Sequence, residues 1–390
     1  MTSPQEDSGS AMPAFKVAML GPSGVGKTSI VVSVLDDAPR ALAHHPVLLR
    51  ARDEPTQRRL QIRRDQLYGG IAAHSFRSDA LSGDQNETYY QLELRVQDSD
   101  VRIDIDLLDY PGGWIVPAED GADGYRRGWQ RVQQFINDTD MILIPIDAVL
   151  LMEARTASQR SAVIDIHSIA AVEDVVEQWA AARRRTNRTP LLIFVPTKTE
   201  SYFADNGGVR DQHRELQAAV TRIYDGVLRR FLLRAPAGEA LYCPVDTLGC
   251  VELTRLDWRP RDDGKFEPQG RFLVRPGQSR IAIRGAADIL VAICRNITSL
   301  AGATADEQAS RLAREHRRAV AEYEAMTEDV FSWLINAITG KTRANKLDQE
   351  KLAADSAQYR VYAEQLANAV TALGTLDYQR AKPVSVEVVR

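Results

Sequence analysis

The feature that most constrains how this chain can fold is a glycine-rich segment directly after a short apolar run. The run is FKVAML at residues 15–20, and GPSGVGKT follows at residues 21–28. This second segment matches G-x-x-x-x-G-K-[ST], whose glycines let successive backbone N–H groups point at a phosphate. An apolar stretch that suits a helix continues to Leu35. The sequence therefore predicts a buried strand, a phosphate-binding loop and a helix, in that order.

The side chains and the backbone of this loop are expected to hold a phosphorylated ligand in different ways. The Lys27 amine would bridge β- and γ-phosphate oxygens, and the Thr28 hydroxyl would bind Mg²⁺. The other positions are expected to make nucleotide contacts mainly through the backbone: Gly21, Ser23, Gly24, Val25, Gly26 and Ser29. The alternative interpretation is a flexible glycine-rich turn without a ligand.

A second phosphate element is predicted at the sequence DYPG, which ends an apolar strand expected over residues 101–109. Asp109 can hold Mg²⁺ through a water molecule at this position. The Gly112 N–H can meet a γ-phosphate because no side chain intervenes. Without a phosphate-binding loop before it, the same sequence would indicate only a turn.

The order of elements along the chain predicts an α/β fold. Alternating polar and apolar residues at 89–97 and 101–109, separated by a short turn, indicate an antiparallel hairpin. Further strands are expected at 141–147, 191–197 and 240–245, with helices near 124–137, 158–185, 209–234 and 286–300. This alternation is typical of a mostly parallel sheet flanked by helices. One strand of the sheet, at 89–97, is expected to be antiparallel.

The domain organisation follows from changes in composition and periodicity. Residues 1–13 are expected to be a disordered tail, and 14–300 a phosphate-loop domain. This domain would carry a long arginine-rich insertion at 37–87 and a β-rich insertion at 250–284. Apolar residues recur at helical spacing in 301–390, which predicts a helical hairpin and tail.

Composition excludes several classes of protein. The chain has 390 residues, of which 44% are hydrophobic and 26% charged, as in ordinary globular proteins. A net charge of −4 argues against bulk nucleic acid as the main partner. No apolar run is long enough to span a membrane, and the polar start is unlike a signal peptide. Three cysteines form neither a disulfide framework nor a metal motif, so a cytoplasmic, reduced protein is expected.

These motifs together resemble the GTPases of the translation-factor and Ras-like (TRAFAC) class. The resemblance implies guanine nucleotide and Mg²⁺ as ligands, and GTP hydrolysis as the activity. It also assigns a switch threonine for Mg²⁺ and the γ-phosphate to Thr88, which directly precedes the strand at 89–97. Lys27, Thr88 and Gly112 are then the candidate catalytic residues, and Thr28, Thr88 and Asp109 the candidate Mg²⁺ ligands. The alternative for Thr88 is a threonine chosen for its β-propensity.

In this class a motif of the type Asn-Lys-x-Asp recognises the base, and here Thr197-Lys198-Thr199-Glu200 stands at its place. The resemblance implies that the Lys198 stem lies along the purine. Glu200 would accept hydrogen bonds from guanine, as the family's aspartate does, although its side chain is longer by one methylene group. The alternative is a helix N-cap. Thr247 and Leu248 belong to the loop that would offer a backbone N–H to the base.

Gly113 stands where Ras-like proteins carry a glutamine that orients water, so slow or partner-stimulated hydrolysis is expected. The sequence DYPGGW and the long segment before the second strand resemble the bacterial YcjX-like branch. A P-loop ATPase, a small-molecule kinase and a degenerate nucleotide-binding scaffold remain alternatives.

The expected partners are a protein effector or a second copy of the chain, bound through the C-terminal helices. The apolar residues Phe331, Trp333, Leu334, Ile335 and Ile338 would serve core or dimer packing. The alternative is peripheral membrane contact, as in dynamin-like GTPases. Similarly, the arginines of the insertion would form a solvated helical face, or else contact a partner, an anionic lipid or RNA.

Overall fold

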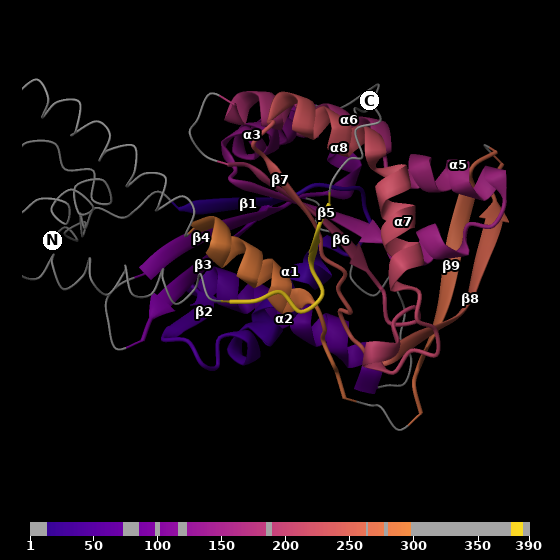
Figure 1. Cartoon of the computed structure of the whole chain (residues 1–390), viewed down its shortest axis with the longest axis horizontal. Coiled ribbons are helices and arrows are strands. Elements are labelled where there is room, and N and C mark those ends of the chain that lie inside the picture. Colours follow the sequence, from indigo (N-terminus) through magenta and orange to yellow (C-terminus); the bar gives the residue numbers. More distant parts are fainter. Residues whose placement is uncertain are drawn as a thin grey trace, which may run out of the picture.

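One eight-stranded sheet with helices on both faces organises the protein (Figure 1). The computed structural model describes residues 14–72, 86–97, 102–115, 123–184, 189–262, 264–276, 280–297 and 376–384. The strand order is β10-β7-β6-β5-β1-β4-β3-β2. Their bounds are β1 Phe15–Met19, β2 Val47–Ala51, β3 Thr88–Val96, β4 Arg102–Asp109, β5 Met141–Asp147, β6 Leu191–Thr197, β7 Glu239–Tyr242 and β10 Lys382–Pro383.

The strand directions confirm the predicted fold class. Strand β1 pairs in parallel with β4 and β5, and β5, β6 and β7 continue the parallel part. The predicted antiparallel strand is β3, which pairs antiparallel with β4 and β2. Two short edge strands, β2 and β10, were not predicted. Strand β10 runs antiparallel to β7.

The described ranges contain eight numbered α-helices, α1 to α8, and a further helix covers residues 286–297. They are α1 Lys27–Ala41, α2 Glu54–Ala72, α3 Asp123–Asp138, α4 Ala148–Glu153, α5 Ala157–Ile166, α6 Ile169–Arg183, α7 His213–Ile223 and α8 Asp225–Arg234. None of the helices in this part of the chain is both long and apolar enough to cross a membrane.

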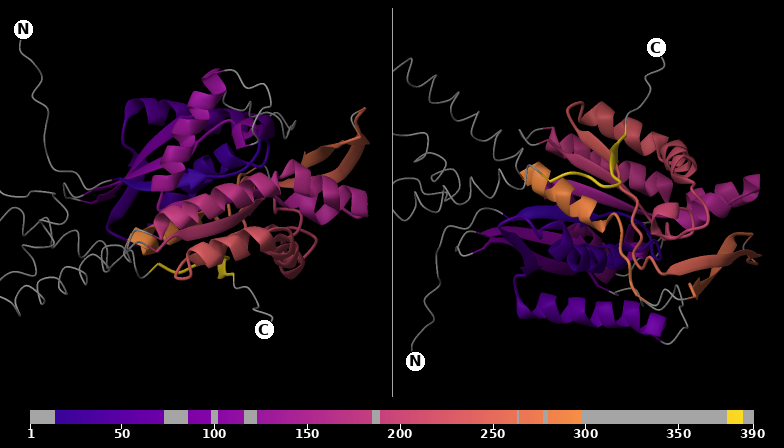
Figure 2. Two further views of the ribbon diagram at one scale, coloured as in Figure 1. Left: turned by 90° about the horizontal axis from the view of Figure 1, so that it is seen from above. Right: turned by 60° about the horizontal axis from the view of Figure 1, so that its bottom comes forward.

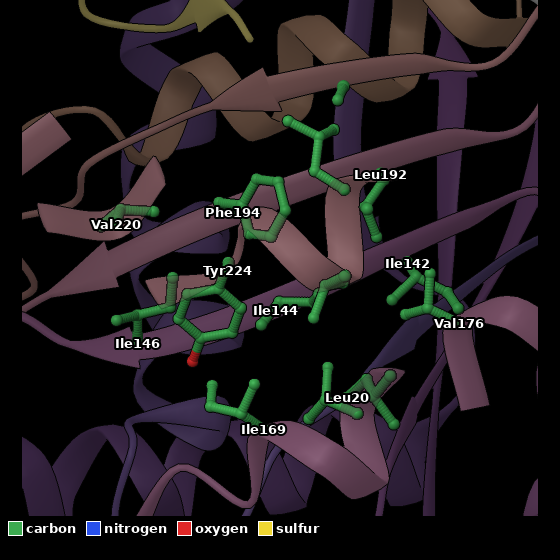
Figure 3. Close-up of a cluster of buried hydrophobic side chains, with 14 of the residues drawn as sticks. Leu20, Ile142, Ile144, Ile146, Ile169, Val176, Leu192, Phe194, Val220 and Tyr224 are labelled. Atoms are coloured by element: carbon green, nitrogen blue, oxygen red, sulfur yellow. The ribbon is translucent and has the colours of Figure 1, made fainter. Parts of the chain in front are cut away.

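Alternation along β1 and the residue after it, Leu20, separates two hydrophobic cores, one on each face of the sheet. Val17 and Met19 join the core under α1 and helix 286–297, whereas Ala18 and Leu20 join the core under α3, α6 and α8. Every residue of β5 and β6 is buried, as expected for strands covered on both faces. Figure 3 shows the second core, where β5 and β6 contribute Ile142, Ile144, Ile146, Leu192 and Phe194.

Two helices predicted as single are each divided in two. The helix expected at 158–185 is interrupted at Ser168, whose backbone φ of 51° lies in the left-handed region. The preceding His167 is fully buried and bonds to two backbone groups, which fixes the interruption. The helix expected at 209–234 divides at Tyr224, whose ring is buried against Phe194.

The ranges expected to be insertions contain regular structure. Strand β2 and helix α2 lie within 37–87, and α1 extends into that range as far as Ala41. Strands β8 (Val251–Pro260) and β9 (Phe266–Val274) lie within 250–284. They pair antiparallel as a separate two-stranded sheet that projects beside α5 (Figure 2).

The predicted N-terminal tail lies outside the described residues, as does most of the predicted C-terminal helical hairpin. Of residues 301–390, the structure describes 376–384. These residues include β10, and the Val384 N–H donates to the Ala240 carbonyl beside β7. The end of the described chain therefore belongs to the main sheet.

At the edge of the sheet where β5 begins, Arg183 of α6 forms a buried ion pair with Asp140. We expect Arg183→Ala to lower the free energy of unfolding by about 3–5 kcal/mol, because it leaves a buried carboxylate without its cation. Arg184→Ala, at the exposed neighbouring position, should change it by less than about 0.5 kcal/mol. Urea denaturation of both variants measures the difference, and equal effects would contradict this account.

Candidate functional site

The loops that follow β1, β4, β5 and β6 gather at one edge of the sheet, because the carboxyl ends of parallel strands face the same way. They carry the phosphate loop at 21–28, the segment at 110–113, Asp147 and the segment at 198–200. The sequence placed candidate site residues in three of these four loops. In the structure, each of these loops contacts at least one of the others.

The phosphate loop takes the conformation that its glycines permit. Gly24 and Gly26 have φ values of 82° and 96°, in the left-handed region that side chains disfavour. Gly26 caps α1, which begins at Lys27. The first turn of that helix has N–H groups without helical partners, so the loop is built to face an anion.

Lys27 is buried inside this loop. Its Nζ donates to the carbonyls of Gly21 at 2.9 Å and Pro22 at 2.8 Å, and lies 5.4 Å from the centre of the Tyr110 ring. Burial lowers the pKa of Lys27 to about 8, while the nearby Asp109 opposes that shift. A phosphate bound here would favour the charged amine, since an opposite charge raises the pKa of a lysine.

Two of the predicted Mg²⁺ ligands are in direct contact, and the third lies opposite one of them in the sheet. The Thr28 hydroxyl donates to Oδ2 of Asp109 at 2.7 Å. Thr88 is the first residue of β3 and lies directly opposite Asp109 in the β3–β4 ladder, which places both side chains on one face of the sheet. Two hydroxyls and one carboxylate form an oxygen-donor set of the kind that Mg²⁺ prefers.

Gly112 lies against the phosphate loop so closely that only a glycine fits. A Cβ at this position would be 2.0 Å from the backbone nitrogen of Ser23. The neighbouring Tyr110, which sequence reasoning did not single out, accepts a hydrogen bond from the Gly21 N–H at 3.3 Å. The segment after β4 is thus in direct contact with the loop after β1, as the second phosphate element requires.

The segment after β6 packs on the other side of the phosphate loop. The Thr197 hydroxyl donates to the Val25 carbonyl at 2.9 Å. Lys198 has a φ of 57°, and its Nζ donates to the Gly24 carbonyl at 3.4 Å and to Asp147 at 2.5 Å. No helix begins here, because the next α-helix of the described chain starts at His213. The helix N-cap interpretation of this segment is therefore wrong.

Asp147 is a site residue that the sequence prediction missed, and a buried histidine positions it. The Asp147 N–H donates to Nε2 of His167 at 3.1 Å, while Nδ1 of the same ring lies 2.9 Å from the Val163 carbonyl. One ring nitrogen therefore accepts and the other donates, as in a neutral imidazole. Burial lowers the pKa of His167, which agrees with the neutral form.

Glu200 and the loop at 246–249 meet, as the predicted base-binding residues should. Oε1 of Glu200 accepts from the N–H groups of Leu248 at 3.1 Å and Gly249 at 3.3 Å. The preceding Thr247 is also buried, and its carbonyl accepts from the Ser33 hydroxyl of α1. Burial, and to a lesser extent the charge of Asp246, raise the pKa of Glu200 to about 7.

The comparisons with known proteins return solved structures at low similarity. No family model and no curated protein matches the chain. Toc33 from Arabidopsis thaliana in complex with Mg²⁺ and GMPPNP is 13% identical, over 74% of this chain and 86% of that chain, with a TM-score of 0.32. A chain of the signal recognition particle receptor SRb-GTP/SRX complex from Chaetomium thermophilum is 12% identical, over 60% of this chain and 92% of that chain, with a TM-score of 0.32. We therefore infer the function from this chain's own residues.

The contact between Gly112 and Ser23 can be tested by replacing Gly112 and its neighbour Gly113, one at a time, with alanine. We expect Gly112→Ala to lower the free energy of unfolding by about 1–3 kcal/mol, because its Cβ would overlap the backbone of the phosphate loop. A Cβ at Gly113 meets no atom within 4 Å, so Gly113→Ala should be nearly neutral. Thermal and urea unfolding of the two variants give the comparison, and a neutral Gly112→Ala would exclude the close approach.

The raised pKa of Glu200 predicts a pH dependence of stability. The folded state holds this proton more tightly than the unfolded state, where the ordinary value is 4.5. The stabilisation is therefore complete below about pH 4.5 and is lost as the pH rises through about 7. Gln at this position keeps an oxygen acceptor without the charge.

We therefore expect the free energy of unfolding of the wild type to fall by up to about 3 kcal/mol between pH 5 and pH 8, relative to that of Glu200→Gln. One pKa unit corresponds to about 1.4 kcal/mol. Urea unfolding of both proteins at several pH values measures this difference. Parallel pH profiles would show that Glu200 does not titrate in this range.

Proposed function

We propose that this chain binds guanine nucleotides together with Mg²⁺, hydrolyses GTP and acts as a nucleotide-dependent switch. The observation that carries the proposal is the contact between the phosphate loop and the segment after β6. Lys198 donates to Gly24, and Thr197 donates to Val25. A triphosphate held by residues 21–28 would therefore extend its nucleoside toward residues 197–200, where Glu200 and the loop at 246–249 are in contact.

Glu200 gives the chemical reason to propose guanine. An ionised carboxylate can only accept hydrogen bonds. The Watson–Crick edge of guanine presents two adjacent donors, N1–H and the exocyclic amine, whereas adenine presents one donor beside an acceptor. The charged form of Glu200 is thus matched to guanine, and the aliphatic stem of Lys198 would lie along the purine face.

Mg²⁺ would be held by Thr28 and Asp109, with Thr88 as a further ligand when a γ-phosphate is present. Bound there, the ion would supply positive charge that neutralises the phosphate groups. In the part of the chain that the structure describes, no three His, Cys, Asp or Glu side chains group as a metal site. The proposed ion therefore depends on the nucleotide for part of its coordination.

The residues of the site explain how GTP would be hydrolysed slowly. Lys27, the N–H groups of the phosphate loop and the Gly112 N–H would stabilise charge on the transferring phosphoryl group. Gly113 offers no side chain to orient the attacking water. We therefore propose that fast hydrolysis needs a group from a partner, as when an arginine is supplied in trans.

The switch would act through segments that touch the γ-phosphate. Its loss would release Thr88 and residues 109–113, and β2 and α2 would follow because β2 pairs with β3 along its whole length. A protein effector, or a second copy bound through the C-terminal helices predicted within residues 301–390, would recognise the change. Membership of the translation-factor and Ras-like class, with the YcjX-like branch as the nearer resemblance, is part of this proposal.

The proposal is tested by displacing a fluorescent guanine nucleotide from the full chain, in Mg²⁺, with GTP, GDP, ATP or ADP. GTP and GDP should displace the probe at concentrations at least about 100-fold lower than ATP and ADP, because hydrogen bonds that only one base can make decide such ratios. Equal displacement by ATP would replace the guanine assignment with an ATPase or a kinase.

The role of Lys27 in the phosphate loop can be tested against a second lysine, Lys16, as a control. Lys27→Ala should weaken GTP binding by about 100-fold or more, because hydrogen bonds to charged groups contribute about 1.5–3 kcal/mol each. Lys16 lies on β1, pairs with Asp138 and is 33% exposed, so Lys16→Ala should bind like the wild type. Full binding by the Lys27 variant would refute this position of the phosphates.

A further inference from the structure

The described chain ends with a segment, residues 376–384, that we name the C-terminal strap. It crosses beside helix 286–297 before joining the sheet as β10 (Figure 2). The N–H groups of Gln379, Arg380 and Ala381 all donate to the buried carboxylate of Asp288, at 2.6–2.7 Å. Arg295 holds the start of the strap through the Leu376 carbonyl. The strap is therefore fixed to the domain by its backbone.

The side chain of Arg380 reaches from the strap into the protein. Its Nη2 donates to Asp246 at 2.8 Å, and Nε and Nη2 donate to the two oxygens of Asp205 at 2.9 and 2.5 Å. The guanidinium also lies 5.0 Å from the centre of the Phe203 ring. Asp246 is fully buried, so Arg380 supplies the cation that this carboxylate needs.

Asp246 connects Arg380 to the proposed base-recognition residues. Its other oxygen accepts a hydrogen bond from the Thr199 hydroxyl. Thr199 lies between Lys198 and Glu200, the two residues proposed to contact the purine. Two hydrogen-bonded steps thus connect the strap with the base side of the site.

A second buried arginine secures the same loops from another element. Arg275, directly after β9, donates to the Glu200 carbonyl at 2.5 Å and to the carbonyls of Asn206 and Gly249 at 2.6 and 3.2 Å. These bonds hold the backbone of both loops. Arg275 therefore supports the loops, and Arg380 alone of the two pairs with the carboxylate that orients Thr199.

We propose that Arg380 is a positioning residue for guanine recognition, and that strap docking and nucleotide binding therefore stabilise each other. This inference rests on the proposed function. Without the guanidinium, the Asp246 carboxylate beside Glu200 would keep the hydrogen bonds from Thr199 and Asn206 but would lose the cation that pairs with it. Because coupling between two binding events is reciprocal, bound nucleotide should hold the strap more firmly in place.

Charge gives the direction of the effect on base selectivity. Asp246 already raises the pKa of Glu200, and removal of the Arg380 cation would strengthen that repulsion. A protonated Glu200 presents a donor toward the two donors of guanine. Replacement of Arg380 by a neutral residue should therefore weaken the binding of GDP more than the binding of ADP. This decrease in GDP affinity should be smaller at higher pH.

The test measures GDP and ADP affinities of the full chain in Mg²⁺ for the wild type, Arg380→Ala, Arg380→Lys and Arg295→Ala. Arg380→Ala should lose at least about tenfold in GDP affinity and in the GDP/ADP ratio, within the usual range of site coupling. Arg380→Lys, which keeps a cation, should recover part of both. Arg295→Ala removes the hydrogen bonds to the Leu376 carbonyl but keeps Arg380, so it should lower the GDP/ADP ratio less than Arg380→Ala does.

The outcomes distinguish this inference from the proposed function. A wild type that does not prefer GDP overturns the proposed function and the inference with it. A GDP-selective wild type overturns the inference alone if Arg380→Ala is equally selective, or if Arg295→Ala lowers the ratio as much.

Hydrogen exchange on the unmutated protein keeps the inference testable if Arg380→Ala does not fold. The amides of Gln379, Arg380 and Ala381 should exchange at least about fivefold more slowly when GDP and Mg²⁺ are added. Unchanged exchange in a protein that binds GDP would overturn the coupling.

Discussion

The charged groups of the candidate site are almost all shielded from water, and a buried charge is tolerated only beside a group that compensates it. Lys27, Asp109, Asp147, Glu200 and Asp246 are each less than 10% exposed. The partners of the four carboxylates come from other strands and loops, so each of these contacts also fixes the distance between two parts of the chain. The compensation of buried charge therefore also determines how the loops of the site are positioned relative to one another.

Much of the fold could be predicted because its signals are local. The strands at 141–147 and 191–197 have the bounds expected from their apolar runs, since a strand buried on both faces needs no partner to be recognised. The phosphate loop could be found because its glycines serve a backbone conformation that side chains disfavour. The close approach of Gly112 to that loop follows the same logic, although only the structure gives its distance.

What could not be predicted depends on contacts between distant segments. Strand β10 has two residues, and only pairing with β7 defines it. The interruption at Ser168 depends on the buried bonds of His167, which helical periodicity does not reveal. Asp147, Asp246 and Arg380 gain their roles from partners 51, 47 and 134 residues away, so no spacing rule links them.

The attachment of Arg295 to Leu376 has a topological consequence. Arg295 lies near the end of helix 286–297, and Leu376 begins the strap, so two described segments that are 81 residues apart in the sequence are in direct contact. The strap then continues into β10, the edge strand beside β7. This contact therefore joins helix 286–297 to the edge of the sheet opposite the one formed by β2.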